Sequence, residues 1–344
     1  MDISGNLSRY KEKLIPAGSK AERNLNKIKK KMKYETTSVL YRVFRYVFLI
    51  SISFIVFRPI FIMLMRSLAL EDDVMTLSFV WLPLNYTFTN FQKLIVLYPH
   101  FVPLFKYTGI ITLGSTALSL VTCSITGYGL SRYKFKGSGI VFMLAIITYI
   151  FPLYMASLPR YVQFHGFDFL GLGQLARIFN NGQPLTINVI DSYWVYFIPA
   201  AFGVGINSGL MIYLFYAFFK AMPAELEEAA RVDGCGRIGI FIRIFIPNSL
   251  PVYITGALLS FIWYWNDSIV ARLLFSDNFK TTIFMYLERR DITGLSYSSN
   301  DTTTVEKMLW WAASCLMSVT PILVIFIVCQ RFFIQCIDRS GIKG

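Results

Sequence analysis

Six long apolar runs, separated by shorter polar connectors, dominate the pattern of the chain. They are Tyr46–Met65, Tyr107–Leu130, Ile140–Leu158, Tyr193–Phe219, Leu250–Trp265 with a few flanking residues, and Met308–Cys329. Each is close to the roughly 20 helical residues that cross the hydrocarbon core of a bilayer. Five of the six runs contain no charged side chain, and the first contains only Arg58. The pattern predicts an all-α integral membrane protein with six transmembrane helices.

The Lys and Arg residues fall mainly in alternate connectors. Residues 1–45 contain twelve Lys and Arg against four Asp and Glu. The connectors after the second and fourth runs and the tail after the sixth run are also basic, whereas the other connectors are balanced in charge. Because cytoplasmic connectors carry an excess of Lys and Arg, the pattern predicts that both termini are cytosolic. Topology thus accounts for most of the net charge of +13, and nucleic-acid binding is not needed to explain it.

Composition and cysteine spacing narrow the function classes further. The chain is 55% hydrophobic and only 15% charged, against roughly 25% charged residues in soluble domains. The five cysteines show no CxxC spacing, so neither a disulfide framework nor a metal site is predicted. About 45 polar and basic residues precede the first apolar run, and that run is therefore expected to remain as an anchor instead of being removed as a signal peptide.

The segment from Glu225 to Pro247, ELEEAARVDGCGRIGIFIRIFIP, is the charged and small-residue connector between the fourth and fifth runs. It predicts a short helix with Pro223 in its first turn, with Leu226, Ala229 and Ala230 on one face. The helix is expected to pair Glu227 with Arg231 on its exposed side and to end at a left-handed Gly234. Small residues allow another backbone to approach closely. From the residues alone, the helix could equally be a connector that lies on its own bundle.

The spacing in this connector resembles the EAA loop of ABC importer permeases, whose pattern is EAA, three residues, Gly, nine residues, then I-x-L-P. Here Glu228, Ala229, Ala230 and Gly234 are followed at the same spacing by Ile244 and Pro247, and only the Leu is replaced, by Ile246. The resemblance implies that a coupling loop of about residues 220–247 docks its helix in a cleft of an ATPase subunit. It assigns this coupling to Glu228, Ala229, Ala230, Asp233, Gly234, Ile244 and Pro247.

Other segments resemble the carbohydrate-uptake branch of the same family, which includes maltose and multiple-sugar importers. These segments are FFKAMPAELEEAARVDG, FIWYWNDS, GYGLSRYKFKGS and the C-terminal QRFFI and SGIKG. Tyr107 and Cys336 depart from the family pattern, where Asn and Gly are usual. The resemblance implies the smaller six-span subunit with the type I importer permease fold, in a bacterial inner or plasma membrane. The expected organisation of the chain is a basic cytosolic N-terminal tail (residues 1–45), a permease domain (residues 46–335) and a cytosolic C-terminal tail (residues 336–344).

The family implies a division of labour among several chains. The expected partners are a second permease subunit, which would make a heterodimer, two ATPase subunits, an extracellular solute-binding protein and membrane lipid. The chain contains no GxxxxGK[ST] phosphate loop, so it is expected to bind no cofactor itself, to be no enzyme and to rely on the partner ATPase for ATP and Mg.

The fifth apolar run carries the candidates for a substrate path. Trp263, Trp265, Asn266 and Asp267 combine aromatic faces with polar groups that suit a sugar ring, although aromatic residues there also suit lipid headgroups. An alternative function is a stand-alone channel or secondary carrier of six spans. Such proteins usually carry acidic relays or paired broken helices within the membrane, and an intramembrane enzyme would need catalytic groups there. Within the bounds given above, the six runs contain no His, Asp or Glu, and Asp267 lies just after the fifth run.

Overall fold

The computed structural model describes residues 20–75, 81–97, 101–151, 155–168, 171, 173, 185–276, 282–289 and 304–341. The described residues are nearly all helical and include no β-strand, only two isolated bridges, Ala69 with Tyr86 and Phe167 with Ile187. The all-α class is therefore confirmed. The chain divides into two compact units, residues 1–62 and residues 63–344, which are described separately below.

The first unit contains most of one long helix, α2, Lys20–Ser67. The helix begins well before the predicted apolar run, and residues 1–19 of the predicted basic tail lie outside the described residues. Its stretch Tyr41–Ser67 is long and apolar enough to cross a membrane. The side chains from Tyr41 to Pro59 are all exposed, as expected for a helix that contacts lipid or another chain.

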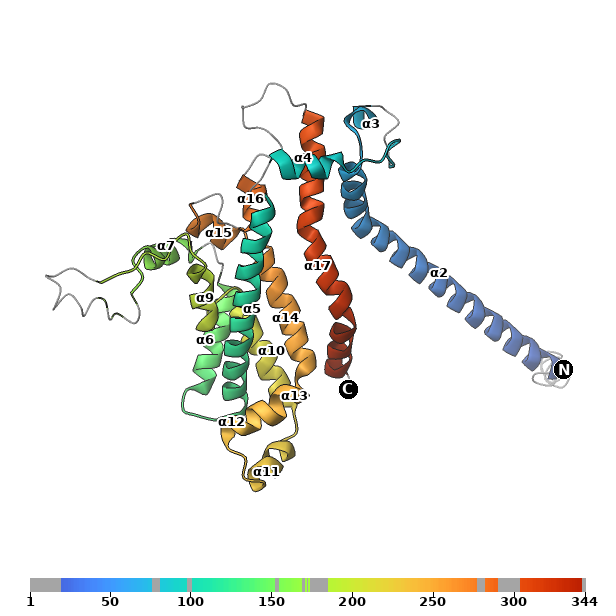
Figure 1. Cartoon of the computed structure of the whole chain (residues 1–344). Helices are drawn as coiled ribbons and strands as arrows, with labels where there is room; N and C mark the ends of the chain where they lie inside the picture. The colour runs from blue at the N-terminus through green and yellow to red at the C-terminus, as the bar shows by residue number, and fades with distance from the viewer. Residues whose placement is uncertain are drawn as a thin grey trace, which may run out of the picture. The chain divides into compact units, whose positions relative to one another are not determined.

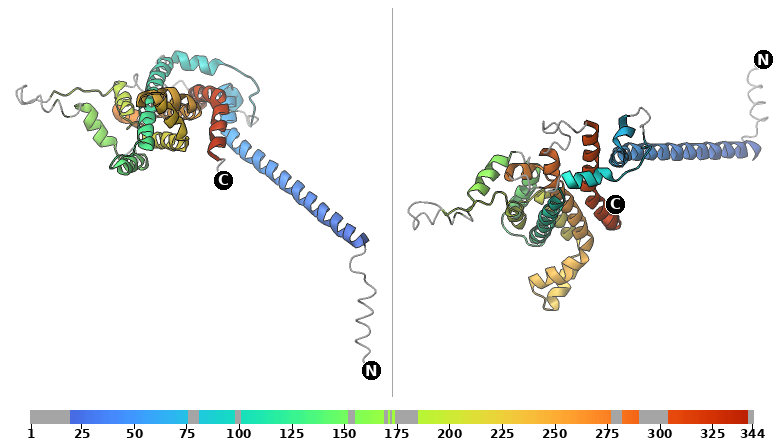
Figure 2. Two further views of the ribbon diagram at one scale, coloured as in Figure 1. Left: turned by 90° about the horizontal axis from the view of Figure 1, so that it is seen from below. Right: turned by 45° about the horizontal axis from the view of Figure 1, so that its top comes forward.

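The second unit is a helical bundle around α5, Phe101–Arg132. Three helices pack directly against α5, namely α9 (Trp194–Ala201), α10 (Ser208–Ala221) and α14 (Leu250–Trp265). Helix α6, Ser138–Ile150, packs on α10, and α17, Thr304–Gly341, packs on α14. Figure 1 shows these helices side by side, and the two views of Figure 2 agree.

Small side chains, rather than large apolar ones, form much of the buried face of α5. Its buried residues include Thr108, Thr112, Ser115, Thr116, Ser119, Cys123, Ser124 and Gly127. A Cβ atom on Gly127 would lie 2.7 Å from Phe215 Cβ of α10. A Cβ atom on Gly209 of α10 would lie 2.3 Å from the Ala145 carbonyl oxygen of α6. Membrane helices commonly approach one another closely through such small residues.

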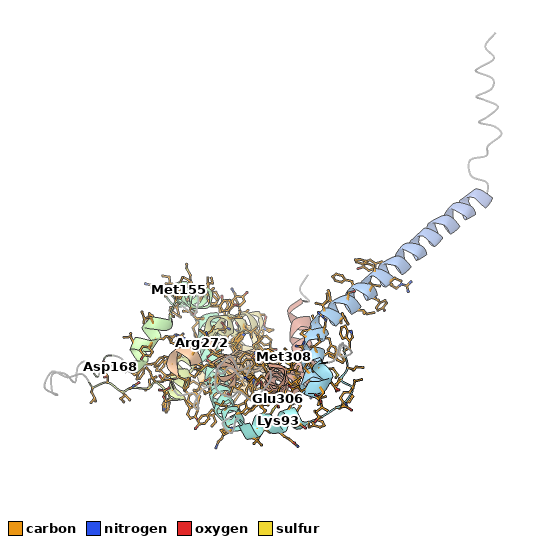
Figure 3. The ribbon with its side chains drawn as sticks, turned by 90° about the horizontal axis from the view of Figure 1, so that it is seen from above. Lys93, Met155, Asp168, Arg272, Glu306 and Met308 are labelled. Carbon is orange, nitrogen blue, oxygen red and sulfur yellow. The ribbon has the colours of Figure 1, made fainter. Side chains whose placement is uncertain are left out.

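Short helices close the two ends of this bundle. One group of short helices lies towards one end of the bundle (Figure 1). These are α3 (Glu71–Met75), α4 (Thr89–Leu97), α7 (Ser157–His165), α15 (Ile269–Leu274) and α16 (Ile283–Arg289). An ion pair between Lys93 and Glu306 joins α4 to α17, and Figure 3 shows the two residues next to each other. A second group lies at the opposite end. It consists of α11 (Glu225–Val232), α12 (Arg237–Ile240), the π-helical turn η3 (Phe241–Phe245) and α13 (Ile246–Asn248).

The helices differ from the six predicted runs at several positions. Three described helices are long and apolar enough to cross a membrane, namely Tyr41–Ser67, Phe101–Arg132 and Val305–Arg331, and a fourth is possible if residues 237–248 and 250–265 form one span bent by 78°. Helices α6 and α10 are shorter apolar helices. The six-span count and the cytosolic termini therefore stay predictions.

Two predicted runs are not single helices, and this part of the prediction was wrong. In Ile140–Leu158, α6 ends at Ile150 and Phe151 is extended, since the residue before a proline such as Pro152 is disfavoured in a helix. In Tyr193–Phe219, α9 and α10 are separated by a break in which Gly203 (φ 71°) and Asn207 (φ 52°) are left-handed. At the C-terminus, α17 continues as a helix to Gly341, beyond the predicted start of the tail at residue 336.

Candidate functional site

Helix α11 is a single short helix with well-defined ends. At its start, the carbonyl oxygen of Ala224 accepts hydrogen bonds from the N–H groups of Glu227 (2.9 Å) and Glu228 (3.0 Å). At its end, Gly234 donates to the Arg231 carbonyl oxygen (3.0 Å) and Cys235 donates to that of Ala230 (2.9 Å). This pair of bonds is a Schellman motif, and it requires the left-handed conformation of Gly234 (φ 77°). The predicted role of Gly234 as the helix end is confirmed.

The two faces of α11 differ from the prediction. Glu227 is only 6% exposed and Ala230 only 4% exposed, so these two residues form the face towards the bundle. Leu226 and Ala229 are exposed and do not share a buried face with Ala230. The predicted Glu227–Arg231 ion pair forms, but Glu227 lies on the buried side of the helix rather than on its exposed side. The reason is a cation on the neighbouring helix.

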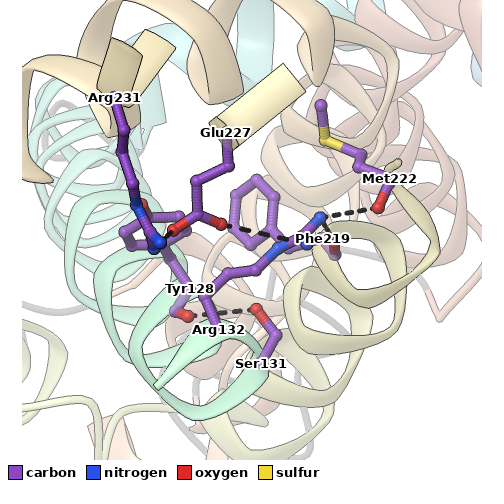
Figure 4. Close-up of polar contacts among 7 residues, drawn as sticks. All are labelled: Tyr128, Ser131, Arg132, Phe219, Met222, Glu227 and Arg231. Atoms are coloured by element: carbon purple, nitrogen blue, oxygen red, sulfur yellow. Dashed lines mark hydrogen bonds and ion pairs between the residues drawn. The ribbon is translucent and has the colours of Figure 1, made fainter. Parts of the chain in front are cut away.

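That cation is Arg132, the last residue of α5, which holds three elements together (Figure 4). Its Nη2 atom donates to the carbonyl oxygens of Phe219 (2.6 Å) and Met222 (2.7 Å) at the end of α10. Its Nη1 atom lies 4.0 Å from Oε2 of Glu227 in α11. Arg132 and Glu227 side chains are only 10% and 9% exposed, respectively. Since a buried carboxylate is costly unless it is paired, Arg132 explains why Glu227 turns inward.

The contacts of Arg132 with Phe219, Met222 and Glu227 form a polar brace, and aromatic rings pack beside it. The Arg132 guanidinium lies 4.8 Å from the centre of the Phe245 ring, a distance typical of a cation–π contact. Tyr128 of α5 packs against Phe241 (4.8 Å between ring centres) and Phe245 (4.9 Å). Phe219 of α10 packs against the same two rings. The end of α5, the end of α10 and the segment after α11 therefore form one packed cluster, in which α11 is held by its buried face.

The outward face of α11 makes no such packing contacts with the residues that the structure describes. The exposed residues of the helix and its C-terminal turn are Glu225, Leu226, Glu228, Ala229, Arg231, Val232, Asp233 and Gly234. Val232 is 87% exposed. In the described part of the chain, no ion-pair partner is recorded for Glu228. A short helix fixed on one side, with an apolar and acidic surface on the other, is suited to contact another protein.

The rest of the predicted loop leads directly into the bundle. Ile244 is half-buried in η3, and its carbonyl oxygen accepts a hydrogen bond from Nδ2 of Asn248 (2.8 Å). Pro247 is exposed in α13. The segment Arg237–Asn248 meets α14 at a bend of 78°. A displacement of α11 can thus reach α14 through one continuous stretch of backbone, and α5 and α10 through Arg132.

The substrate-path candidates lie away from α11, near the other end of α14. Trp263 is half-buried and Asn266 is exposed. Trp265 is buried, stacks on Phe261 (5.5 Å between ring centres) and donates from Nε1 to the Ser318 carbonyl oxygen of α17 (3.0 Å). The structure thus gives Trp265 an intramolecular partner and leaves Asn266 open, and a substrate path through these residues stays a prediction.

Asp267 follows α14 and is buried. Its carboxylate accepts hydrogen bonds from the Tyr196 hydroxyl (2.6 Å) and from the N–H groups of Val270 (3.3 Å) and Ala271 (3.2 Å). Burial raises the pKa of the Asp267 carboxyl, and these hydrogen bonds partly offset that effect. Asp267 therefore fixes the start of α15 against α9. Among the described residues, no group of three or more His, Cys, Asp or Glu side chains could hold a metal ion.

Sequence reasoning missed Arg132 as a functional residue. In the sequence it lies in the GYGLSRYKFKGS segment, as one of several basic residues of the connector after the second apolar run. A useful signal was available, because an Arg that ends a long apolar helix can bind the free carbonyl groups at a neighbouring helix end. Which helix end it would reach depends on tertiary packing, and the sequence pattern does not contain that information.

Comparisons with known proteins identify the family of the chain. Residues 124–339 match the family model described as "Binding-protein-dependent transport system inner membrane component". The chain is 25% identical to the polygalacturonan/rhamnogalacturonan transport system permease protein YtcP of Bacillus subtilis, over 89% of this chain and 99% of that protein. It is also 25% identical to the maltodextrin transport system permease protein MdxG of Bacillus subtilis, over 91% of this chain and 100% of that protein.

A solved structure has a similar fold. A chain of a bacterial ABC transporter involved in the import of the acidic polysaccharide alginate matches with a TM-score of 0.66 and 20% sequence identity, over 86% of this chain and 98% of that chain. The matched family region contains the end of α5, all of α11 and most of α17. The chain therefore belongs to the family of binding-protein-dependent transport system inner membrane components, and it is a permease subunit of an ABC importer in the inner membrane.

Proposed function

We propose that the chain is the permease subunit of an importer for an oligosaccharide, and that α11 couples ATP hydrolysis to transport. Relatives at 25% identity that carry polygalacturonan or maltodextrin in their names support a carbohydrate substrate. The proposed complex contains a second permease subunit, two ATPase subunits that bind ATP and Mg, and an extracellular solute-binding protein. The proposed topology has six spans and two cytosolic termini, and α11 then lies on the cytosolic side.

The observation that carries this proposal is the two-sided character of α11. Its buried face is tied to α5 and α10 through Glu227 and Arg132, while Glu228, Ala229 and Val232 are exposed. In the proposed mechanism the exposed face docks in a cleft of the ATPase. Glu228 contributes a charge, Ala229 permits close approach, and Asp233 and Gly234 form the turn.

Coupling then follows from a switch between two states. Closure of the nucleotide-bound ATPase pair displaces α11, and the buried face transmits the displacement to the membrane helices. ATP can shift the permease between its two states only if the ATPase contacts α11 differently in each of them. Ile244 and Pro247 lie on the backbone that leads from α11 to the bend before α14, so they take part in the same displacement.

The test is a charge reversal on the exposed face. Glu228→Lys and Gly234→Asp should each abolish ATP-driven uptake by the reconstituted importer, while this chain still assembles with its partner permease. A matched control is Lys106→Glu, which reverses an exposed charge near the opposite end of α5 and should leave uptake unchanged. Uptake near the wild-type rate in both α11 variants would refute the coupling role.

A further inference from the structure

A cavity of about 260 Å³ lies between α6, α7 and the break that joins α9 to α10. Its polar lining residues are Thr148, Tyr149, Arg160, Asn207 and Ser208, and its apolar lining includes Ile147, Phe151 and Val204. The described lining contains no Asp or Glu. The volume is close to the lower limit of roughly 300 Å³ for small-molecule sites. The cavity therefore has a mostly apolar wall that carries several polar groups and one positive charge, and it is close in size to known ligand sites.

Ser208 provides a buried hydroxyl that has no partner. It is 2% exposed, it lines the cavity, and its Oγ atom makes no hydrogen bond within the described structure. A buried hydroxyl without a partner carries a desolvation cost that a ligand in the cavity would remove. Ser208 is also the first residue of α10, and a helix N-terminus favours negative charge, although the N–H groups of Ser208, Leu210 and Met211 already donate to the carbonyl oxygens of Gly205 and Asn207.

Arg160 provides the charge of the cavity. It belongs to α7, and its Nη2 atom donates one hydrogen bond, to the Val204 carbonyl oxygen (3.2 Å). A guanidinium group has five N–H donors, so this bond leaves most of them available. Arg160 also lines a second cavity of about 220 Å³, together with Asp168 and Val204. The Asp168 carboxylate in that second cavity accepts a hydrogen bond from the Gly173 N–H (2.6 Å), and the Asp267 carboxylate is bonded to Tyr196, Val270 and Ala271.

The geometry points to an anion subsite, and we propose that this cavity binds the carboxylate of an acidic oligosaccharide, such as one that contains uronate residues. Arg160 would pair with the carboxylate, Ser208 would donate its hydroxyl, and Thr148 and Asn207 would bind neighbouring sugar hydroxyls. The inference rests on the proposed carbohydrate function and extends it to the charge of the substrate. A neutral sugar would leave the Arg160 charge without a counter-charge in the cavity, so the site favours an acidic one.

Binding to the complete purified importer tests this directly. Isothermal titration calorimetry would compare trigalacturonate with its neutral methyl ester. Charge-assisted hydrogen bonds of the kind expected here correspond to a tenfold to roughly hundredfold change in affinity. The wild-type importer should bind trigalacturonate at least about tenfold more tightly than the ester. Arg160→Gln should remove that preference with little effect on the ester, and Arg160→Lys should restore part of it.

Two further variants and one further ligand sharpen the test. Ser208→Ala should weaken trigalacturonate binding severalfold, whereas Lys106→Gln, which removes an exposed charge away from the cavity, should not. Equal affinity of the wild-type importer for the acid and the ester, absence of binding, or an unchanged preference in Arg160→Gln would each overturn the proposal. Tighter binding of inorganic phosphate than of trigalacturonate would also overturn it.

Failure here is distinguishable from failure of the coupling role. The coupling role is tested by variants of α11 and read as uptake, whereas the subsite is tested by variants of α7 and α10 and read as the ratio of two dissociation constants. If Glu228→Lys abolishes uptake but the wild-type importer binds the acid and the ester equally, the proposed function stands and only the proposed charge preference is refuted.

Discussion

Arg132→Met is the most informative single substitution in the brace that holds α11. Methionine keeps an unbranched side chain of moderate length but removes both hydrogen bonds to the end of α10 and the ion pair with Glu227. The buried carboxylate of Glu227 then has only Arg231 as a partner. We expect α11 to detach from the bundle more often while the membrane helices remain folded, because α5 packs against α9, α10 and α14 through buried residues that extend from Phe101 to Tyr128.

The size of the effect follows from the contacts. Hydrogen bonds that involve a charged group contribute about 1.5–3 kcal/mol each, and Arg132 makes two, at 2.6 and 2.7 Å. Removing one partner of a buried ion pair costs about 3–5 kcal/mol, and the remaining Glu227–Arg231 pair places this case at the lower limit. The lower end of either estimate is about 3 kcal/mol. This corresponds to an at least roughly 100-fold larger population of detached α11, because about 1.4 kcal/mol is tenfold in an equilibrium constant.

Hydrogen–deuterium exchange of the reconstituted importer measures that population. A detached helix as short as α11 does not stay folded in water. The N–H groups of Gly234 and Cys235, which are hydrogen-bonded to the last turn of α11, should therefore exchange about 100-fold faster in Arg132→Met, and uptake per ATP hydrolysed should fall. The exchange rate in Arg132→Lys should lie between those of the wild type and Arg132→Met, since one ammonium group cannot reproduce the two-pronged hydrogen bonding of a guanidinium group. Lys134→Met removes an exposed charge two residues away and serves as the control. Unchanged exchange together with normal uptake in Arg132→Met would show that Arg132 does not hold α11.

Three other predictions address packing, topology and the C-terminus. Gly209→Ala should lower the stability of the purified importer by about 1–3 kcal/mol, because the new Cβ would lie too close to the Ala145 carbonyl oxygen. The control Gly109→Ala, whose new Cβ would have no atom within 4 Å, should not lower it. Equal melting temperatures of the two variants would contradict this prediction. In a background without the other cysteines, a membrane-impermeant thiol reagent should label Cys235 only from the cytosol and a cysteine at position 165, in His165→Cys, only from outside; cytosolic labelling of position 165 would exclude the six-span topology. Deletion of residues 337–344 should lower stimulated ATP hydrolysis without loss of membrane insertion, and a full-length rate in the truncated importer would show that this end has no role in coupling.

Apolar runs and motif spacing were sufficient to predict the helical class, the family and the position of α11. These features are local, since an apolar run of sufficient length predicts a helix in a membrane wherever it packs. The left-handed end of α11 at Gly234 was also predictable, because glycine is the residue that most easily adopts that conformation.

Features that depend on contacts between distant segments could not be predicted in the same way. The burial of Glu227 requires Arg132, which is far away in the sequence. The break between α9 and α10 lies inside an apolar run without any charged residue, and its left-handed Asn207 gives no strong sequence signal. The anion subsite likewise depends on α7 and the start of α10 lining one cavity.

The contrast between α5 and α6 has a thermodynamic consequence. Helix α5 buries hydroxyl groups and glycine, whereas α6, which is almost entirely apolar, has no buried residue along its length. Pulling α5 out of the bundle into lipid would therefore replace one water-free environment by another. Unfolding of soluble proteins has a heat-capacity change of about 12–15 cal/mol/K per residue, because it exposes apolar surface to water. Separation of these membrane helices should have a much smaller heat-capacity change, so that its free energy varies almost linearly with temperature.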